Sequence, residues 1–431
     1  MRFEMIQRAI DILRGKRKPA MYYRAYHKRL QDKARSLKSA GVIRVAFLYK
    51  YSTDCQALNL LNALLQDKDF RVCIIINPDV ARWEDTRYEE TRAYFVKHYG
   101  ESLVRDGYDS ATQTFRDYTG EFDLMIPDGP YESMSHDYFK IGYWADRGVL
   151  VLYISYFYMG RCQVSVENMQ MEHINKLWLF CVENPFVVEL AKENMLLKGK
   201  NVMMSGYPKM DSLQAYITQA ANDKARANIK AAGGGHRSER KRVIISPHHS
   251  FYFDLIGAFM YFYEALVECM EEFSEIDFVF RPHPLLKEAL SKEEHWGVDR
   301  TQKYFDRVCS LPNVKYSMAG DYLDEFARSD ALIHDCGSFM AEYLYTNKPC
   351  AFMYRKDLNM SQFMPFGLRC LEAHYSMFDK NDIVAFLREV VLEGRDSKKQ
   401  ARHAFATSEV MINYPHATQI IHQYLRSALR A

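Results

Sequence analysis

Two short turns in the second half of the chain carry residues that suit an anionic ligand. In RPHP (281–284), prolines flank His283 and restrict the backbone, which holds its ring in one direction. An imidazole can donate to a phosphate or take a proton from a hydroxyl, and the guanidinium of Arg281 offers a planar fork of donors. This turn predicts phosphate chemistry. The structural alternative is an arginine that pairs with a nearby carboxylate while His283 packs the turn.

The preceding turn, SPHHSF (246–251), holds Ser246 and the adjacent pair His248 and His249. Neighbouring residues on an extended segment point in opposite directions, so only one histidine of the pair is expected to face a ligand. The sequence does not choose between them. We expect Ser246 to contact substrate and one histidine to act on it, and the alternative is a histidine that caps the following helix.

A third turn, HDCGSFMAEY (334–343), joins a strand to a helix through a glycine. The N–H groups of Gly337, Ser338 and Phe339 are expected at the positive end of that helix, which favours a diphosphate. Glu342 lies four residues after Ser338 on the same helix face and is expected to reach the ribose of a nucleotide. The alternative is that Ser338 is only an N-cap. Together the three turns predict a nucleotide-diphosphate pocket.

These turns follow strands in a chain that alternates short apolar runs with helical segments, which indicates an α/β fold with parallel sheets. The alternation stops at a Gly-rich connector and then restarts at RVIISP (242–247). Two such halves predict two Rossmann-like domains that face each other across a cleft, where ligands bind. The expected parts are a basic amphipathic arm (1–40), an acceptor domain (41–212), a linker helix and connector (213–241), a nucleotide-donor domain (242–400) and a C-terminal helix (401–431).

The motifs SPHHS, FVFRPHPLL, SDALIHDCGSFMAEYLYTNKP and SGYPKMD resemble those of the CDP-glycerol glycerophosphotransferase family, which includes teichoic-acid primases and polymerases. The resemblance implies a GT-B fold and a CDP-linked donor. It implies transfer of glycerol phosphate, or a related polyol phosphate, to a hydroxyl of a lipid-linked or polymeric cell-surface saccharide, with release of CMP. It also matches His283 to a family histidine, Ser338 to the phosphate-binding serine, and Lys209 to the arginine of a GYPRxD turn.

Besides Lys209, a second position departs from the family pattern. Relatives often carry a His-Gly pair after a first-domain strand, with that histidine as the expected base, whereas this sequence reads Tyr158-Met159-Gly160. Asp128 and His136, around PDGPYE, are the remaining candidates for a base, each with a structural role as its alternative. Two other functions stay open. A GT-B glycosyltransferase with a nucleotide sugar needs the same second-domain pocket, and a non-catalytic membrane-associated scaffold keeps the same fold.

The composition of the 431-residue chain, 48% hydrophobic and 14% aromatic, excludes an intrinsically disordered protein. No apolar run approaches the roughly 20 residues of a membrane span, and the start lacks the continuous apolar stretch of a secretory signal. Nine scattered cysteines without CxxC spacing indicate neither a zinc nor a redox site and fit a reducing cytoplasm. No carboxylate cluster has metal-ligand spacing, so no cofactor is expected, and a bound divalent ion stays open.

Residues 1–40 carry twelve basic and three acidic side chains, a net charge of +9, whereas the rest of the chain is −7. Phe3, Ile6, Ile10 and Leu13 recur at helical spacing and give one apolar face. A basic amphipathic arm suits an anionic surface, which predicts a cytoplasmic enzyme peripheral on the inner face of the cell membrane. The alternative is a helix packed on the body. Nucleic acid is not expected, because the remainder is acidic and carries no binding motif.

Overall fold

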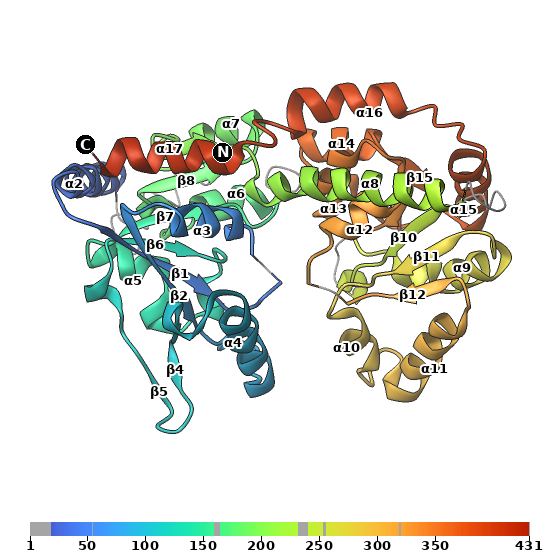
Figure 1. Ribbon diagram of the computed structural model, residues 1–431, viewed down its shortest axis with the longest axis horizontal. Coiled ribbons are helices and arrows are strands. Elements are labelled where there is room, and N and C mark those ends of the chain that lie inside the picture. The colour runs from blue at the N-terminus through green and yellow to red at the C-terminus, as the bar shows by residue number, and fades with distance from the viewer. Residues whose placement is uncertain are drawn as a thin grey trace. The chain divides into compact units, whose positions relative to one another are not determined.

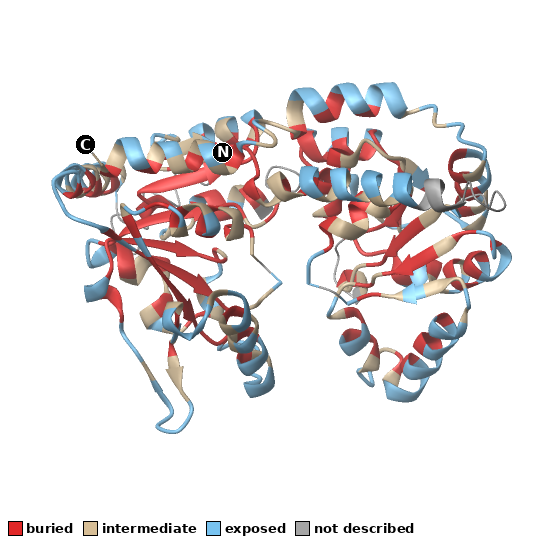
Figure 2. Ribbon diagram, viewed as in Figure 1, coloured by how far each residue is buried: buried red, intermediate tan, exposed pale blue. Residues whose placement is uncertain are grey.

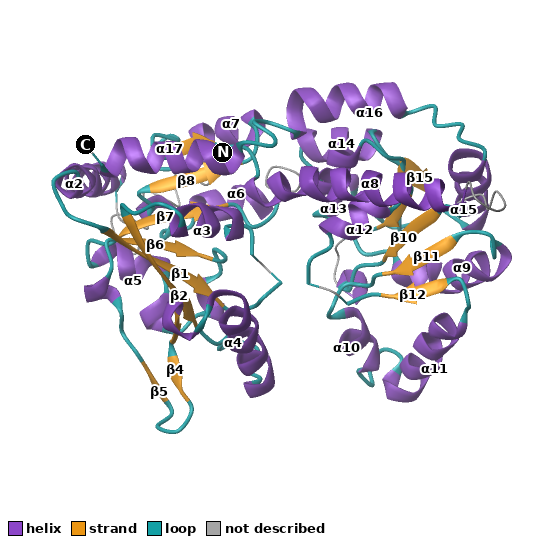
Figure 3. Ribbon diagram, viewed as in Figure 1, coloured by secondary structure: helices purple, strands orange, loops and turns teal. Residues whose placement is uncertain are grey.

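The computed structural model describes residues 19–53, 55–158, 164–231, 240–252, 256–318 and 320–430. The chain divides into two compact units. The first unit comprises Met1–Asp211 and Ile412–Ala431, and the second comprises Ser212–Met411. Each unit is a parallel β-sheet surrounded by helices (Figures 1 and 3), which confirms the predicted α/β class.

The sheet of the first unit has seven parallel strands in the order β3-β2-β1-β6-β7-β8-β9. Its central strands are apolar runs buried along nearly their whole length (Figure 2), as expected for a parallel sheet covered on both faces. The strands are β1 (Ile43–Tyr49), β2 (Phe70–Ile76), β3 (Val104–Asp106), β6 (Leu124–Pro127), β7 (Leu150–Ile154), β8 (Leu179–Val182) and β9 (Val202–Met204).

Helices and one small hairpin complete the first unit. The hairpin of β4 (Tyr108–Asp109) and β5 (Thr114–Phe115) projects from the body of the unit (Figure 1). The helices are α2 (Ala20–Leu37), α3 (Leu58–Leu65), α4 (Asp85–Tyr99), α5 (Ile141–Asp146), α6 (Val164–Gln170), α7 (Pro185–Asn194) and α17 (Ala417–Leu429).

The second unit has a six-stranded parallel sheet in the order β12-β11-β10-β13-β14-β15. Its strands are β10 (Arg242–Ser246), β11 (Asp277–Phe280), β12 (Val314–Tyr316), β13 (Ala331–His334), β14 (Cys350–Met353) and β15 (Tyr375–Met377). Its helices are α8 (Leu213–Ala231), α9 (Phe259–Glu272), α10 (Leu286–Ser291), α11 (Gly297–Ser310), α12 (Leu323–Arg328), α13 (Phe339–Glu342), α14 (Pro365–Glu372), α15 (Lys380–Ala385) and α16 (Lys399–Phe405).

Strand order reverses once in each sheet, between β1 and β6 in the first unit and between β10 and β13 in the second. In open α/β sheets, ligands bind outside the carboxyl ends of the strands at such a switch point. Ligand-binding residues are therefore expected directly after β1, β6, β10, β11 and β13.

The last helix, α17, belongs to the first unit although it follows the whole second unit in sequence. Its buried residues recur at every fourth position, Ala417, Ile421, Leu425 and Leu429. Asp67 forms ion pairs with His422 (2.8 Å) and Arg426 (2.7 Å) and anchors the helix from the side. The expectation of one C-terminal helix over 401–431 is corrected here, because α16 and α17 are separate helices in different units.

Helix α2 forms most of the described part of the basic arm. One side of it is buried, through Tyr23, Tyr26, Leu30, Ala34 and Leu37. The hydroxyl of Tyr26 also donates to Asp146 at 3.3 Å. This stretch therefore packs on the first unit, while the predicted apolar face of Phe3 to Leu13 lies outside the described residues. Within the part of the chain that the structure describes, no helix has the length and apolarity to cross a membrane.

Candidate active site

The three predicted turns of the second unit meet at the switch point of its sheet. Ser246, the last residue of β10, pairs in register with His334 of β13, and Ile245 pairs with Phe280 of β11. SPHHS, RPHP and HDCGS therefore all begin at the carboxyl edge of neighbouring strands, and the topology brings them together as the sequence predicts.

Hydrogen bonds tie the first two turns to each other. The N–H of Arg281 donates to Ile245 O (2.8 Å), and the N–H of His283 donates to Pro247 O (2.9 Å). The hydroxyl of Ser246, which was expected to contact substrate, instead donates to the carbonyl of Arg281 at 2.7 Å. Ser246 thus joins the two turns and helps to fix the position of His283.

Three imidazole rings cluster where these turns meet. The ring centroids of His249 and His283 are 4.0 Å apart, and those of His248 and His283 are 4.6 Å apart. His248 and His249 lie 4.5 Å from each other, so both members of the adjacent pair reach His283. The sequence predicts that only one of the pair faces a ligand; in the structure the segment is a turn rather than an extended strand, and both rings lie beside His283.

Backbone N–H groups donate to Nδ1 in two of these rings, and in His248 the same atom also lies 2.8 Å from the Ser250 hydroxyl. The N–H of Leu285 donates to His283 Nδ1 (3.1 Å), and the N–H of Ser250 donates to His248 Nδ1 (3.2 Å). A neutral imidazole that accepts at Nδ1 carries its proton on Nε2. His248 and His283 are therefore held as hydrogen-bond donors through Nε2–H, which is the polarity that an anionic oxygen requires.

The hydrogen bonds at Nδ1 also affect whether the histidine cluster can bind a cation. A nitrogen from each of the three rings lies within 4.8 Å of the others, a spacing from which a metal site could form. A metal-ligating histidine, however, keeps its proton on the other ring nitrogen and donates it to an acceptor. In His248 and His283 that other nitrogen accepts from the backbone instead, so these residues fit an anion better than a metal ion.

Arg281 is held in the interior of the site by a carboxylate. Its side chain is 11% exposed and pairs with Glu325 at 2.9 Å and with the Ser317 hydroxyl at 3.2 Å. Its guanidinium carbon also lies 5.5 Å from the ring centroid of Tyr322. The arginine–carboxylate pair considered as the structural alternative is thus present. It fixes the guanidinium of Arg281 beside Glu325 and offsets its charge.

Asp335 positions the SPHHS turn, a role that the sequence reading missed. Its buried carboxylate accepts the N–H groups of His248 and Ala258, each at 2.5 Å. Burial raises the pKa of Asp335 to about 7, and the two N–H donors oppose that rise. The sequence position could have indicated this role, because Asp335 directly follows a strand at the sheet edge where the histidines lie.

The third turn is more compact than predicted. Ser338 precedes α13, a helix of one turn that continues as a 3₁₀ turn over Tyr343–Thr346. The Ser338 side chain makes no capping hydrogen bond, so the plain N-cap alternative is not observed. Glu342 is 1% exposed and accepts a hydrogen bond from the Tyr322 hydroxyl. Gly337 and Phe339, the other predicted contacts of a diphosphate, are buried on either side of Ser338.

Two further buried histidines lie behind this turn. The ring centroids of His334 and His374 are 5.1 Å apart, and both residues are fully buried. Burial lowers the pKa of His374 to about 4 and holds the pKa of His334 well below its usual value. Both rings are therefore neutral at physiological pH and support the turn as packing groups.

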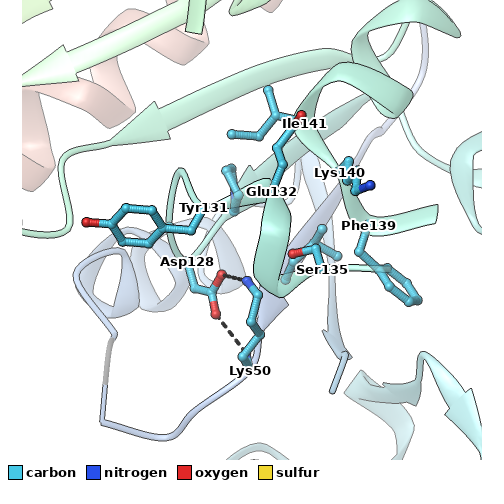
Figure 4. A pocket seen from close by; sticks show the side chains of 11 residues that line it. Lys50, Asp128, Tyr131, Glu132, Ser135, Phe139, Lys140 and Ile141 are labelled. Atoms are coloured by element: carbon cyan, nitrogen blue, oxygen red, sulfur yellow. Dashed lines mark hydrogen bonds and ion pairs between the residues drawn. The ribbon is translucent and has the colours of Figure 1, made fainter. Parts of the chain in front are cut away.

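The switch point of the first unit contains a buried ion pair. Lys50 follows β1 and Asp128 follows β6, and Lys50 Nζ lies 2.6 Å from Asp128 Oδ1. The other carboxylate oxygen accepts the backbone N–H of Lys50 at 2.7 Å. Figure 4 shows this pair at a shallow hollow that is also lined by Tyr131 and Glu132. Asp128, a candidate base, is thus engaged by a lysine that the sequence reading did not single out.

His136, the other candidate base, has structural partners. Its ring stacks on Phe115 with centroids 3.8 Å apart and planes 3° apart. Its Nδ1 accepts the N–H of Tyr138 at 3.3 Å and caps a short 3₁₀ turn. Its pKa is lowered by burial. Met159 and Gly160, where relatives carry the His-Gly pair, lie outside the described residues.

The GYPKMD motif (206–211) holds the C-terminal helix. Gly206 has φ +83°, and a Cβ at this position would collide with the carbonyl of Ile412. Asp211 accepts the N–H groups of the first two residues of α17, at 3.3 and 2.7 Å, and so caps that helix. Lys209, expected to bind substrate, lies half-buried in the 3₁₀ turn between them.

Comparisons with known proteins agree with these features. The family model of CDP-glycerol:poly(glycerophosphate) glycerophosphotransferase matches residues 159–362, a little under half of the chain. The matched part includes all three turns of the second unit. No curated protein matches the sequence.

Solved structures show the fold. The wall teichoic acid polymerase TagF is similar over 99% of this chain and 98% of its own, with a TM-score of 0.57 and 12% identity. UDP-GlcNAc 2-epimerase from Neisseria meningitidis, bound to UDP-GlcNAc, is similar over 89% of this chain and 99% of its own (TM-score 0.52, 12% identity). UDP-GlcNAc 2-epimerase from Methanocaldococcus jannaschii, in complex with UDP-GlcNAc and UDP, is similar over 89% of this chain and 99% of its own, with a TM-score of 0.53 and 14% identity.

The similar structures confirm the GT-B fold. The activity is indicated by the family match instead. The resemblance that the motifs indicated is confirmed over residues 159–362. Residues 159–362, which include the three turns, thus match the CDP-glycerol glycerophosphotransferase family, and this similarity supports a transferase that uses CDP-glycerol.

Proposed function

We propose that the chain transfers glycerol phosphate, or a related polyol phosphate, from a CDP-linked donor to a hydroxyl of a lipid-linked or polymeric saccharide, and releases CMP. In this reaction the acceptor oxygen forms a bond to the distal phosphorus of the donor. The bond from that phosphorus to the bridging oxygen breaks, and the bridging oxygen leaves with CMP. The acceptor proton passes to a base or to water.

One observation carries this proposal, namely the fixed polarity of the histidine cluster. The Nε2–H groups of His248 and His283 are donors at the carboxyl edge of the second sheet, where ligands of such sheets bind. Charge accumulates on the phosphate oxygens during transfer, and donors held in place beforehand stabilise that charge without reorganising. We assign both rings to the donor diphosphate.

The remaining site residues take roles consistent with that assignment. The N–H groups of residues 337–339 and the Ser338 hydroxyl contact the diphosphate, and Glu342 contacts the ribose. Arg281, paired with Glu325, keeps the RPHP turn in place. His249 is our candidate for the proton acceptor, because the other two rings of the cluster are fixed as donors. We further propose that the second unit binds the donor and the first unit binds the acceptor.

A donor panel tests the reaction. The purified protein is incubated with a lipid-linked saccharide acceptor and with CDP-glycerol, CDP-ribitol or several nucleotide sugars, and the released nucleotide is quantified. CMP release from a CDP-polyol that depends on acceptor supports the proposal. Release of a nucleoside diphosphate from a nucleotide sugar would assign a glycosyltransferase instead, and binding without turnover across all acceptors would assign a scaffold.

We also propose that the basic arm holds the enzyme on the anionic inner surface of the cell membrane. Because α2 packs on the first unit, the test deletes only residues 1–18. Sedimentation with phosphatidylglycerol vesicles should fall on deletion, and raised salt should weaken binding of the full chain. Equal binding of both forms would assign the arm to packing.

A further inference from the structure

Two loops that follow strands of the first unit each expose an aromatic side chain. Trp83, in the loop after β2, is 39% exposed, and Val80 in the same loop is 38% exposed. Tyr131, in the loop after β6, is 36% exposed. Single exposed apolar side chains are common, whereas contiguous ones indicate binding.

The two loops are joined in two places. The N–H of Val80 donates to Met134 O at 3.1 Å. On the other side, Phe115 of the β4–β5 hairpin contacts Trp83 edge-on at 6.2 Å and stacks on His136 at 3.8 Å. Met134 and His136 both follow β6, so the loop that holds Tyr131 is tied to the loop that holds Trp83.

Both exposed rings are fixed in orientation by bonds at their polar edges. The indole N–H of Trp83 donates to Asp85 at 2.8 Å, and Tyr108 contacts the indole in a T-shaped arrangement at 4.7 Å. The hydroxyls of Tyr131 and Tyr156 lie 2.8 Å apart. Aromatic side chains held in this way offer contact area at little entropic cost on binding.

Polar groups adjoin this surface. Tyr131 also lines the hollow at the switch point, together with Glu132, Ser135 and Lys140 (Figure 4). In that view the Tyr131 ring extends away from the buried Lys50–Asp128 pair. An aromatic surface beside a polar hollow suits a ligand that has both an apolar face and hydroxyl groups.

The local charge decides which such ligand fits. The segment 77–90 has a net charge of −3, from Asp79, Glu84, Asp85, Glu89 and Glu90 against Arg82 and Arg87. An acidic segment disfavours an anionic lipid surface or a bare polyol-phosphate chain. A sugar ring is neutral, stacks its C–H face on aromatic side chains and offers hydroxyls to carboxylates.

We propose that Trp83 and Tyr131 form a stacking surface for a neutral saccharide ring of the acceptor. The inference rests on the proposed function for its biological ligand, since it names the part of the acceptor that the first unit recognises. The hairpin residues Tyr108 and Phe115 are positioning residues, because they hold the indole from one side without contacting the sugar.

The fluorescence of the protein gives a direct readout of this surface. Trp83 is well exposed, whereas the other tryptophans, Trp144, Trp178 and Trp296, are at most 9% exposed. Titration of the full chain with N,N′-diacetylchitobiose or cellobiose should change the fluorescence saturably, and glycerol 3-phosphate should not. Trp83→Leu should abolish the change. A response that survives this substitution, or a response to phosphatidylglycerol vesicles and not to saccharide, would overturn the proposal.

Kinetics then separate this surface from the donor site. Trp83→Ala and Tyr131→Ala should each raise the KM for a saccharide acceptor roughly fivefold to tenfold, with kcat and CMP binding unchanged, and Trp83→Phe should keep most of the affinity. Phe378→Ala in the second unit, where Phe378 is 58% exposed, is the matched control and should have no effect. An unchanged KM in both variants would overturn the proposal. Loss of CMP binding by the parent protein would instead refute the proposed function, because the saccharide titration needs no donor.

Discussion

At the switch point of the first sheet, Lys50 and Asp128 lie 2.6 Å apart, and both side chains are buried. At the switch point of the second sheet, two imidazoles accept backbone N–H groups at Nδ1, and Arg281 is paired with Glu325. The same topology thus places a neutral ion pair after the strands of the first sheet and hydrogen-bond donors for an anion after those of the second. The fold supplies the location, and the residues after each strand decide the chemistry.

The largest effect is expected when the ion pair of Lys50 and Asp128 is broken. Asp128→Ala leaves the ammonium of Lys50 buried without its carboxylate, which costs about 3–5 kcal/mol of stability when a buried pair is broken. Urea unfolding should show that loss, and the double variant Lys50→Met with Asp128→Leu should recover much of it. The surface pair Lys192 and Glu189 is the control, because both side chains are more than half exposed. A stable Asp128→Ala protein that has lost turnover would restore Asp128 as a candidate base.

The second prediction removes a donor from the other edge. His283→Ala should reduce transfer by about 10²-fold while the fold is kept, because a preorganised donor to the phosphate is lost. His283→Gln should retain more activity than His283→Ala, since an amide can still donate but cannot act as a base. The exposed His403→Ala serves as the control. If the Gln and Ala variants were equally inactive, the ring would be a proton acceptor rather than a donor.

The comparison also shows what the sequence could reveal. Apolar runs ending in polar turns predicted the strands of both sheets closely. For example, the run expected over 242–247 forms β10 at Arg242–Ser246. The edge strands β3 and β15 were missed, because neither lies in a continuous apolar run. Return of α17 to the first unit was also missed, since nothing local shows which body a helix covers.

Within the site, residue types were predictable but their partners were not. Local motifs identified His283 and Arg281, because proline and strand ends leave a signature in sequence. The pairing of Lys50 with Asp128 joins positions 78 residues apart, and that of Asp335 with the His248 N–H joins positions 87 apart. Such contacts depend on strand order. Strand order also decides whether a carboxylate serves as a base, a positioning group or half of an ion pair.

The third prediction loosens the donor edge without touching its rings. In Asp335→Asn, the amide can accept one of the two backbone N–H groups but presents its own NH₂ to the other, which costs about 1–3 kcal/mol. Burial raises the pKa of Asp335 in the native state from 3.8 to about 7. Between pH 3.8 and pH 7, Asp335 is therefore protonated in the native state and ionised in the unfolded state. The contribution of Asp335 to the free energy of unfolding therefore falls as pH rises from about 4 to about 7. Urea titrations at several pH values should show the advantage of the parent over the variant shrinking across this window. A constant difference would mean that Asp335 is ionised throughout.

The smallest expected effect distinguishes two contacts within the third turn. Ser338→Ala removes one neutral hydroxyl and should weaken CMP and pyrophosphate binding alike by a few-fold. Glu342→Ala should weaken CMP by about tenfold and leave pyrophosphate unchanged, because a carboxylate bonds the ribose hydroxyls more strongly than a neutral group would. Tyr322→Phe is the control, since its hydroxyl already donates to Glu342. If Tyr322→Phe matched the CMP loss of Glu342→Ala, the carboxylate would act by holding Tyr322, and the ribose contact would have to be sought on another element of the second unit.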